Sequence, residues 1–236
     1  MKHILLTRFA LRFEDGNPRR RFEQRHGWID YRMKLFKKYC LPSVQAQTFQ
    51  DFDWWFLVDY NFPGLIDRDI NELNTHGKCL FMTDKWSEKQ DGVGKTLSQY
   101  YKDEWICSTR LDSDDIIHNE FMAMVADAAK EKEEWISFPH GYFLKEATGK
   151  YIPREYLTNP FVSYVEYADP FTSVMKINHI RAGKHGPGIQ TIMTSAWVQV
   201  DHGDNIKNDA GKRFSNFDAE ALDAEELDDR FTYKRR

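Results

Sequence analysis

The hydrophobic pattern of the first half of the chain predicts buried strands. Short apolar runs, each bounded by polar or turn-forming residues, have the continuous hydrophobicity of strands that are covered on both faces. They are His3–Thr7, Trp54–Asp59, Lys78–Met82 and Trp105–Leu111. Runs of this kind are typical of a parallel sheet packed between two layers of helices.

Helical periodicity fills the intervals between these runs. The predicted helices are Tyr31–Tyr39, a short segment that begins at Pro42, Ile66–Asn74 and Val93–Lys102. After the last run, an apolar stripe at helical spacing predicts one more helix, through Phe121, Met122, Val125, Ala128 and Ala129. The alternation predicts an α/β fold with a Rossmann-like, mostly parallel sheet flanked by helices.

The second half of the chain has a different pattern. Trp135–Leu144 predicts a strand interrupted by a proline and a glycine, with Gly149–Tyr156 as its hairpin partner, and Ala196–Val200 predicts another strand. Residues 159–188 mix aromatic residues, prolines and glycines without a clear period, which is typical of a substrate-binding region. The acidic segment Ala219–Asp229 predicts a surface helix.

Length and composition narrow the class of protein. The chain has 236 residues without a linker or repeat, which predicts a single domain. Its net charge of -4 gives no overall signature of a nucleic-acid-binding protein. The absence of a long apolar run and of a secretory signal predicts a cytoplasmic protein. Three widely spaced cysteines predict buried thiols, not a disulfide framework or a zinc site.

The residues after the strand Trp105–Leu111 form the strongest candidate site. Asp112-Ser113-Asp114-Asp115 places three carboxylates within four residues, where they repel one another unless a cation offsets their charge. Such hard oxygen ligands suit Mg²⁺ or Mn²⁺, which proteins commonly hold with one or two carboxylates and substrate phosphates. The cluster therefore predicts a divalent metal site for a substrate that carries a diphosphate.

The same acids could instead cap the helix that follows them. A calcium loop of the EF-hand type is excluded, because it would need an oxygen ligand at Ile116 and a glycine at Ile117. If the acids hold a metal, replacing Asp114 by asparagine in the metal-free protein is expected to cost little stability, since it relieves repulsion.

A second candidate is the glycine-rich segment Asp91–Thr96. It contains Gly-Lys-Thr, but it is not a P-loop, because the first glycine of that motif would fall at Lys89. A helix that starts at Gly92, with Lys95 beside it, would turn free N–H groups toward an anion. A simple helix start with a glycine turn explains the same residues.

Taken in order, these segments resemble the GT-A glycosyltransferases, and within them the family of putative rhamnosyltransferases. The resemblance runs from about Met1 to Asn208. The motifs that carry it are Thr7-Arg8-Phe9, Cys40–Thr48, the strand end at Asp59, Gly92–Thr96 and Arg110-Leu111-Asp112-Ser113-Asp114-Asp115. It implies one GT-A domain with a nucleotide-sugar-binding half (residues 1–117), an acceptor and catalytic half (118–210) and a C-terminal tail (211–236).

The resemblance also implies site residues. A nucleotide-sugar donor would contact Thr7, Arg8, Asp59, Gly92, Lys95, Arg110 and Asp112, and Mn²⁺ or Mg²⁺ would be bound by Asp112, Asp114 and His202. His202 follows the predicted strand Ala196–Val200 in a polar turn, so a surface histidine is the alternative interpretation.

The implied reaction moves a sugar from a nucleotide diphosphate to an acceptor hydroxyl through an oxocarbenium-like transition state. The metal would stabilise the departing diphosphate. If the reaction inverts the anomeric centre, a carboxylate must take the acceptor proton. Glu166 is the first candidate for this base and Asp169 the second, although Asp169 precedes Pro170 and also fits a turn.

The acceptor stays open at this stage. A saccharide or a lipid-linked acceptor is favoured over the alternative of a phage-type glycosyltransferase that acts on modified DNA bases. For DNA, Arg19-Arg20-Arg21 and Lys234-Arg235-Arg236 could contact phosphates, although solvated basic patches explain them more simply. A third hypothesis, from another class, is a nucleotide-binding protein without catalysis.

Overall fold

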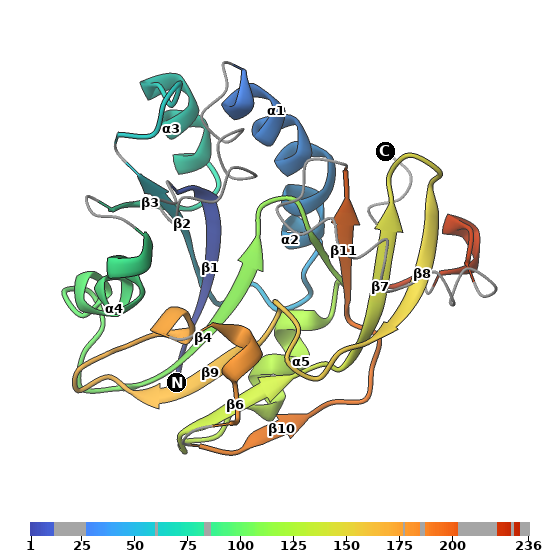
Figure 1. Ribbon diagram of the computed structural model, residues 1–236. Helices are drawn as coiled ribbons and strands as arrows, with labels where there is room; N and C mark the ends of the chain where they lie inside the picture. Colours follow the sequence, from blue (N-terminus) through green and yellow to red (C-terminus); the bar gives the residue numbers. More distant parts are fainter. Residues whose placement is uncertain are drawn as a thin grey trace.

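The computed structural model describes residues 1–11, 27–59, 61–82, 86–176, 178–184, 187–202, 221–227 and 229–231, with the backbone alone for 86–91. These residues form two β-sheets and the helices that pack on them (Figure 1). The basic runs at residues 19–21 and 234–236 lie outside the described residues.

The larger sheet has seven strands in the order β10-β6-β9-β4-β1-β2-β3. Their bounds are β1 (Lys2–Ala10), β2 (Asp53–Asp59), β3 (Lys78–Met82), β4 (Trp105–Asp112), β6 (Glu134–Ser137), β9 (Ser163–Tyr167) and β10 (Ile189–Thr191). Only β9 runs antiparallel to its neighbours, so the predicted mostly parallel sheet is confirmed. The four N-terminal strands match their predicted ranges closely, whereas β9 lies in the region that showed no period.

The smaller sheet has four strands in the order β5-β11-β7-β8. They are β5 (Ile116–Ile117), β7 (His140–Lys145), β8 (Lys150–Glu155) and β11 (Trp197–Asp201). The predicted interruption within Trp135–Leu144 is where the chain leaves the larger sheet after β6 and enters the smaller one as β7. The hairpin of β7 and β8 is as predicted.

Helices cover both faces of the larger sheet. They are α1 (Trp28–Leu35), a π-helical turn η2 (Phe36–Cys40), α2 (Leu41–Gln45), α3 (Asp67–Asn74), α4 (Trp86–Leu97) and α5 (Phe121–Ala128), with short 3₁₀ turns η3 (Val174–Lys176) and η4 (His179–Arg181). Since strand side chains alternate, Leu5 packs with α1 and α5, while Leu6 packs with α4 and η3. No described helix is long and apolar enough to span a membrane.

The predicted helix Val93–Lys102 is wrong at both ends. Helix α4 begins at Trp86, so Gly92 and Lys95 lie inside the helix and not at its N-terminus. Gly94 lies against the backbone of Phe171 and Thr172, and a β-carbon there would come within 2.4 Å of the Phe171 carbonyl oxygen. Close packing explains Gly94, and no free N–H groups are available at Gly92 to bind an anion.

The predicted surface helix over Ala219–Asp229 is also wrong in its described part. Leu222 forms a β-bridge with Tyr151, and Ala224–Glu226 is a single 3₁₀ turn, η6. Leu227 and Phe231 are buried with residues of the smaller sheet. The described C-terminal residues, 221–227 and 229–231, therefore form a strap packed on the second sheet.

Alanine substitutions at the two glycines of α4 should change the free energy of unfolding in opposite directions. Gly94→Ala should lower the free energy of unfolding by about 1–3 kcal/mol, because its new methyl group meets backbone atoms that cannot move aside. Gly92→Ala should raise it by up to about 1 kcal/mol, since the nearest atom is 3.8 Å away and alanine favours the helix. Urea unfolding of both variants checks this, and equal effects would contradict the position of α4.

Candidate active site

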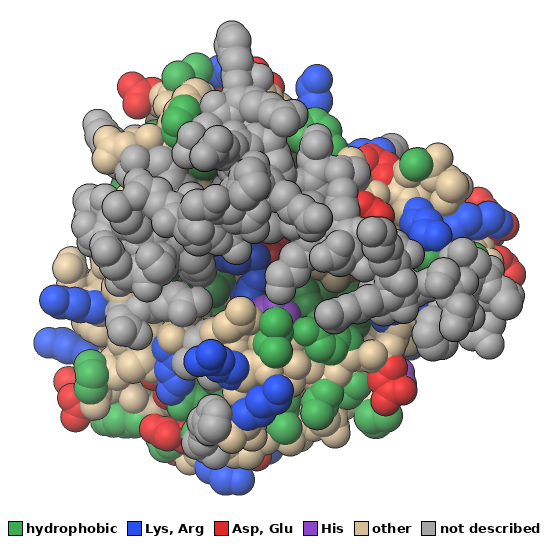
Figure 2. Space-filling view, viewed as in Figure 1, with side chains coloured by type: hydrophobic (Ala, Val, Ile, Leu, Met, Phe, Trp, Pro, Cys, Tyr) green, Lys and Arg blue, Asp and Glu red, His purple; other side chains and the backbone are tan. Residues whose placement is uncertain are grey.

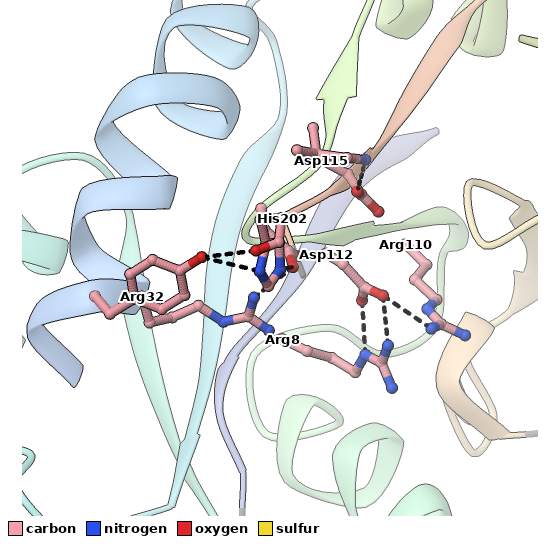
Figure 3. A network of polar contacts seen from close by, with 9 residues as sticks. Arg8, Arg32, Arg110, Asp112, Asp115 and His202 are labelled. Atoms are coloured by element: carbon pink, nitrogen blue, oxygen red, sulfur yellow. Dashed lines mark hydrogen bonds and ion pairs between the residues drawn. The ribbon is translucent and has the colours of Figure 1, made fainter. Parts of the chain in front are cut away.

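The acid cluster lies at the sheet edge where the parallel strands β1 to β4 end. The parallel register of β1 and β4 sets Arg8 beside Asp112. In the smaller sheet, β11 pairs with β5 through Val198 and Ile116 and then continues past it. This extension brings Val200 and His202 to the turn that holds Asp114 and Asp115, and α1 lies on the opposite side (Figure 3).

Asp112 is held by two arginines. Nε and Nη2 of Arg8 donate to its two carboxylate oxygens at 2.7 and 2.5 Å, which is the bidentate geometry that suits guanidinium and carboxylate. Nη2 of Arg110 donates to Oδ2 of the same carboxylate at 3.3 Å. Arg110 can do so because residues two apart on β4 share a face of the sheet.

Asp114 has a different pair of partners. Its Oδ2 lies 2.5 Å from Nη1 of Arg32 and 2.9 Å from Nε2 of His202. The hydroxyl of Tyr31 lies 3.1 Å from Nδ1 of His202 and donates to the His202 carbonyl at 3.3 Å. Helix α1 thus supplies one partner of Asp114 and positions the other.

Asp115 joins the turn to the second sheet. Its Oδ1 accepts the backbone N–H of Val200 at 2.9 Å, and the residue is 2% exposed. The third acid therefore turns away from the arginines and fixes the position of β11, from which His202 extends.

The three carboxyl groups differ in charge state. Burial opposes the ionisation of Asp112 and Asp114. Arg8 and Arg110 nevertheless hold the pKa of Asp112 well below the usual range, and Arg32 and His202 lower the pKa of Asp114. Burial, together with the two ionised acids, raises the pKa of Asp115 well above its usual value. The turn therefore holds two stable carboxylates and one group that favours its protonated form.

The arginines carry a positive surplus. Among the printed contacts of the described residues, three guanidinium groups face two ionised carboxylates. Burial beside Arg8 lowers the pKa of Arg110 to about 10. Nε of Arg110 is buried and has no hydrogen-bond partner in the described structure. The expectation that Asp114→Asn costs little stability is therefore corrected, because the change would leave the partly buried Arg32 without its anion. The surplus charge also favours an anionic ligand beside Arg110.

The predicted metal ligands come together only in part. Asp114 and His202 touch, and their oxygen and nitrogen atoms form a donor pair that suits Mn²⁺ or Mg²⁺. The Asp112 carboxylate faces Arg8 and Arg110 instead. The described residues contain no group of three side chains placed to hold an ion, so phosphate oxygens would have to complete the coordination.

The other predicted nucleotide contacts occupy different environments. Asp59 is fully buried at the end of β2 and accepts the N–H of Asn61 at 2.9 Å. Thr7 is fully buried within β1, and its hydroxyl accepts the indole N–H of Trp54 at 2.8 Å. Asp59 stands at the correct sheet edge, whereas the Thr7 side chain packs into the α1 face. Lys95 is exposed on α4.

The predicted bases Glu166 and Asp169 lie at the other end of the sheet. Glu166 pairs with Ile106 at the start of β4, six residues and so roughly 20 Å from Asp112. Its buried carboxylate accepts the backbone N–H groups of Thr172 and Ser173 at 2.9 and 2.7 Å. Asp169 is exposed beside the same strand start. This placement corrects the base assignment, since Glu166 holds the loop after β9.

Two residues that contact the acid cluster or its histidine were not predicted from the sequence. Tyr31 and Arg32 belong to a helix that was predicted only from its periodicity, and Arg32 lies among Trp28, Ile29 and Met33 on it. The available signal was an arginine one turn after Trp28, over whose ring the Arg32 guanidinium lies at 5.3 Å. Nothing local in the sequence indicates that this helix faces the acids.

The charge states predict opposite stability effects for neighbouring acids. Asp114→Asn should lower the free energy of unfolding by about 1–3 kcal/mol, because it leaves the partly buried guanidinium of Arg32 without its anion. Asp115→Asn should raise it, since the amide can still accept from Val200 and the cost of ionising a buried acid disappears. A raised folded pKa costs stability above the unfolded value of about 3.9, so the gain should grow from pH 5 to pH 8. Urea unfolding at both pH values measures it; losses in both variants would contradict the charge assignment.

Comparison with solved structures confirms the GT-A fold. The S. aureus TarS fragment 1–349 in complex with UDP-GlcNAc superposes with a TM-score of 0.54 at 12% identity, over 88% of this chain and 61% of that one. The same fragment in complex with UDP gives 0.52 at 12% identity, over 85% and 61%. The chain thus spans about three fifths of the length of these structures. At this identity the likeness shows the fold alone.

A family model matches this chain, whereas no curated protein does. The model of the family described as "Putative rhamnosyl transferase" matches residues 2–213, which is most of the chain, and the protein belongs to that family.

Proposed function

We propose that the protein is a glycosyltransferase that moves a sugar from a nucleotide-diphosphate donor to an acceptor hydroxyl. The observation that carries the proposal is the turn after β4, where two ionised carboxylates and three arginines meet at the carboxyl edge of a GT-A sheet. Membership of the rhamnosyl transferase family supports it. In open α/β sheets this edge is where ligands bind.

The nucleotide would lie over the ends of β1, β2 and β3. Asp59 stands at the end of β2, and Arg8 connects this region to Asp112. TarS was crystallised with UDP and with UDP-GlcNAc, which makes UDP sugars the first donors to test. GDP and dTDP sugars are the others, because the family description points to a deoxyhexose and not to a base. CMP sugars, which carry one phosphate, serve as the comparison.

The diphosphate would lie beside the arginines. Arg110 has unused donor capacity, and the positive surplus of the cluster disappears when a diphosphate binds. Guanidinium groups bind phosphate in the same forked geometry that Arg8 shows toward Asp112. Arg110 and Arg8 would therefore hold the leaving group while its bond to the sugar breaks.

Mn²⁺ or Mg²⁺ would be held by Asp114 and His202 together with phosphate oxygens. Bound there, the ion would offset the charge that develops on the departing diphosphate. Arg32 shares Oδ2 of Asp114 with His202, so it competes for the same oxygen. When Arg32 releases that oxygen, its guanidinium becomes available to the phosphates.

Asp114→Asn tests the donor site. The variant should lose the rise in melting temperature that Mn²⁺ and the donor produce together, because a neutral amide is a poor ligand for a hard cation. In the wild type, a donor at 100 times its dissociation constant should stabilise by about 2.7 kcal/mol. A thermal-shift screen of UDP, GDP, dTDP and CMP sugars measures this, each variant against its own unliganded state. The exposed Asp127→Asn is the control, and a full shift in Asp114→Asn would remove Asp114 from the site.

Arg32→Gln tests the competition at Asp114. Without nucleotide, Mn²⁺ should bind this variant roughly tenfold more tightly, since about 1.4 kcal/mol lies between the values for two charges 4 Å apart in water and near a protein surface. Donor affinity should fall, because a phosphate contact is lost. Electron paramagnetic resonance of free Mn²⁺ and calorimetry with the donor measure the two effects. Arg68→Gln, at an exposed arginine, is the control, and weaker Mn²⁺ binding by Arg32→Gln would contradict the competition.

The two alternative functions are outcomes of the same experiments. Nucleotide binding without turnover across a broad acceptor panel would support a binding protein. Salt-sensitive binding of duplex DNA would support a DNA acceptor. The basic runs that suggested DNA lie outside the described residues.

A further inference from the structure

The sheet edge beyond Arg110 carries exposed apolar side chains that the donor site does not use. Tyr156 and Leu157 follow β8, and Met193 follows β10; they are 40, 46 and 67% exposed. The end of β6 holds their backbones together, because the Ser137 hydroxyl donates to the Leu157 carbonyl and the Ser137 carbonyl accepts the N–H of Ile192. Strands β6 and β10 run parallel, so this patch shares the carboxyl edge of the sheet with the acid cluster.

His179 on η4 adjoins this patch. Its ring meets the Tyr156 ring edge-on with centroids 6.2 Å apart, and its Nδ1 lies 2.5 Å from the Thr158 carbonyl oxygen. A carbonyl can only accept, so the hydrogen is on Nδ1 and the lone pair of the neutral ring is on Nε2. Within the described structure Nε2 has no hydrogen-bond partner, and it is not among the fully buried polar atoms.

The path of the chain brings His179 toward the donor site. The N–H of Val174 in η3 donates to the Ser108 hydroxyl at 2.8 Å, two residues before Arg110 on the same face of β4. Burial, then the charge of Arg110, lowers the pKa of His179 to about 4, so the ring is neutral at pH 7. Figure 2 shows basic side chains and a histidine at the bottom of a hollow in this face, with hydrophobic side chains next to them.

We propose that Tyr156, Leu157, Met193 and His179 form a saccharide acceptor subsite, in which Nε2 of His179 accepts the proton of the reacting hydroxyl. This inference rests on the proposed transferase function. As the acceptor oxygen bonds to the anomeric carbon, its proton moves to Nε2. The bond from that carbon to the phosphate oxygen breaks, and its electron pair leaves with the nucleoside diphosphate. His179 thus takes the role of base that the sequence predicted for Glu166. Glu166 lies on β9 beside the start of β4, roughly 20 Å from Asp112.

A saccharide fits the chemistry of this surface. A half-exposed tyrosine ring offers a flat apolar face for the C–H side of a sugar, and a neutral imidazole accepts from a hydroxyl. Donor binding would also favour proton transfer, because the diphosphate offsets the arginine charges that oppose protonation of His179. The charge of Arg110 acts on His179, which indicates that this surface lies toward the arginine beside which the leaving group would lie.

His179→Asn and Tyr156→Ala test the subsite. Asparagine keeps a donor for Thr158 but lacks Nε2, so transfer should fall by roughly 10² to 10⁴ while the donor-induced thermal shift stays unchanged. Tyr156→Ala should raise the acceptor KM at nearly constant kcat. The control is Tyr167→Ala, at an exposed tyrosine beside the start of β4, which should change neither KM nor kcat. The assay follows nucleoside diphosphate release from the donor selected by thermal shift, with a panel of p-nitrophenyl monosaccharides. The acid limb of the kcat/KM profile should be missing in His179→Asn.

The possible outcomes distinguish failure of the transferase function from failure of the role proposed for His179. If the wild type shows no shift or turnover with any nucleotide sugar, the transferase function fails. If the wild type transfers and His179→Asn does so at a similar rate, His179 is not the base, while the transferase function stands. Acceleration by a lipid-linked acceptor or by duplex DNA, and by no free saccharide, would overturn the saccharide assignment.

Discussion

The site depends on neutralising carboxylates that the fold buries. Asp112 and Asp114 sit at the end of a strand where ionisation would be unfavourable without nearby cations. The parallel register of β1 supplies Arg8, β4 itself supplies Arg110, and α1 supplies Arg32. Asp112 pairs with Arg8 and Arg110, and Asp114 pairs with Arg32, so the positions of these elements are tied to the acids.

The second sheet completes this arrangement. The N–H of Val200 fixes Asp115, which places β11 so that His202 reaches Asp114. The C-terminal strap supports the same corner, since Phe231 packs edge-on against His118 and the Arg230 carbonyl accepts the N–H of Asn119. In the reaction we propose, the donor on the β1 side and the acceptor on the β6 side would meet at Arg110, whose Nε has no hydrogen-bond partner in the described structure.

Local pattern predicted the parts of the fold that local interactions determine. The strand β2, Asp53–Asp59, is almost continuously buried and has an apolar run along its length, so its ends could be found from sequence. The start of α4 was predicted too late because Gly94 was interpreted as part of a glycine turn before the helix. Gly94 lies inside the helix and packs against the backbone of Phe171, far along the chain. The acids were identified by their own spacing, whereas Arg32 reaches them through tertiary packing that no spacing encodes. Glu166 was misplaced for a related reason: strand β9 went unrecognised, so its direction along the sheet was unknown.

The central claim is that the turn after β4 binds the diphosphate of a nucleotide sugar beside Asp114. The most direct measurement is the ³¹P hyperfine coupling to Mn²⁺ in the complex with a nucleoside diphosphate, by electron–nuclear double resonance. The account predicts a strong coupling from directly coordinated phosphate in the wild type, together with ¹⁴N coupling from an imidazole that disappears in His202→Gln. A nucleotide that binds with neither coupling, or a coupling that survives unchanged in Asp114→Asn, would contradict it.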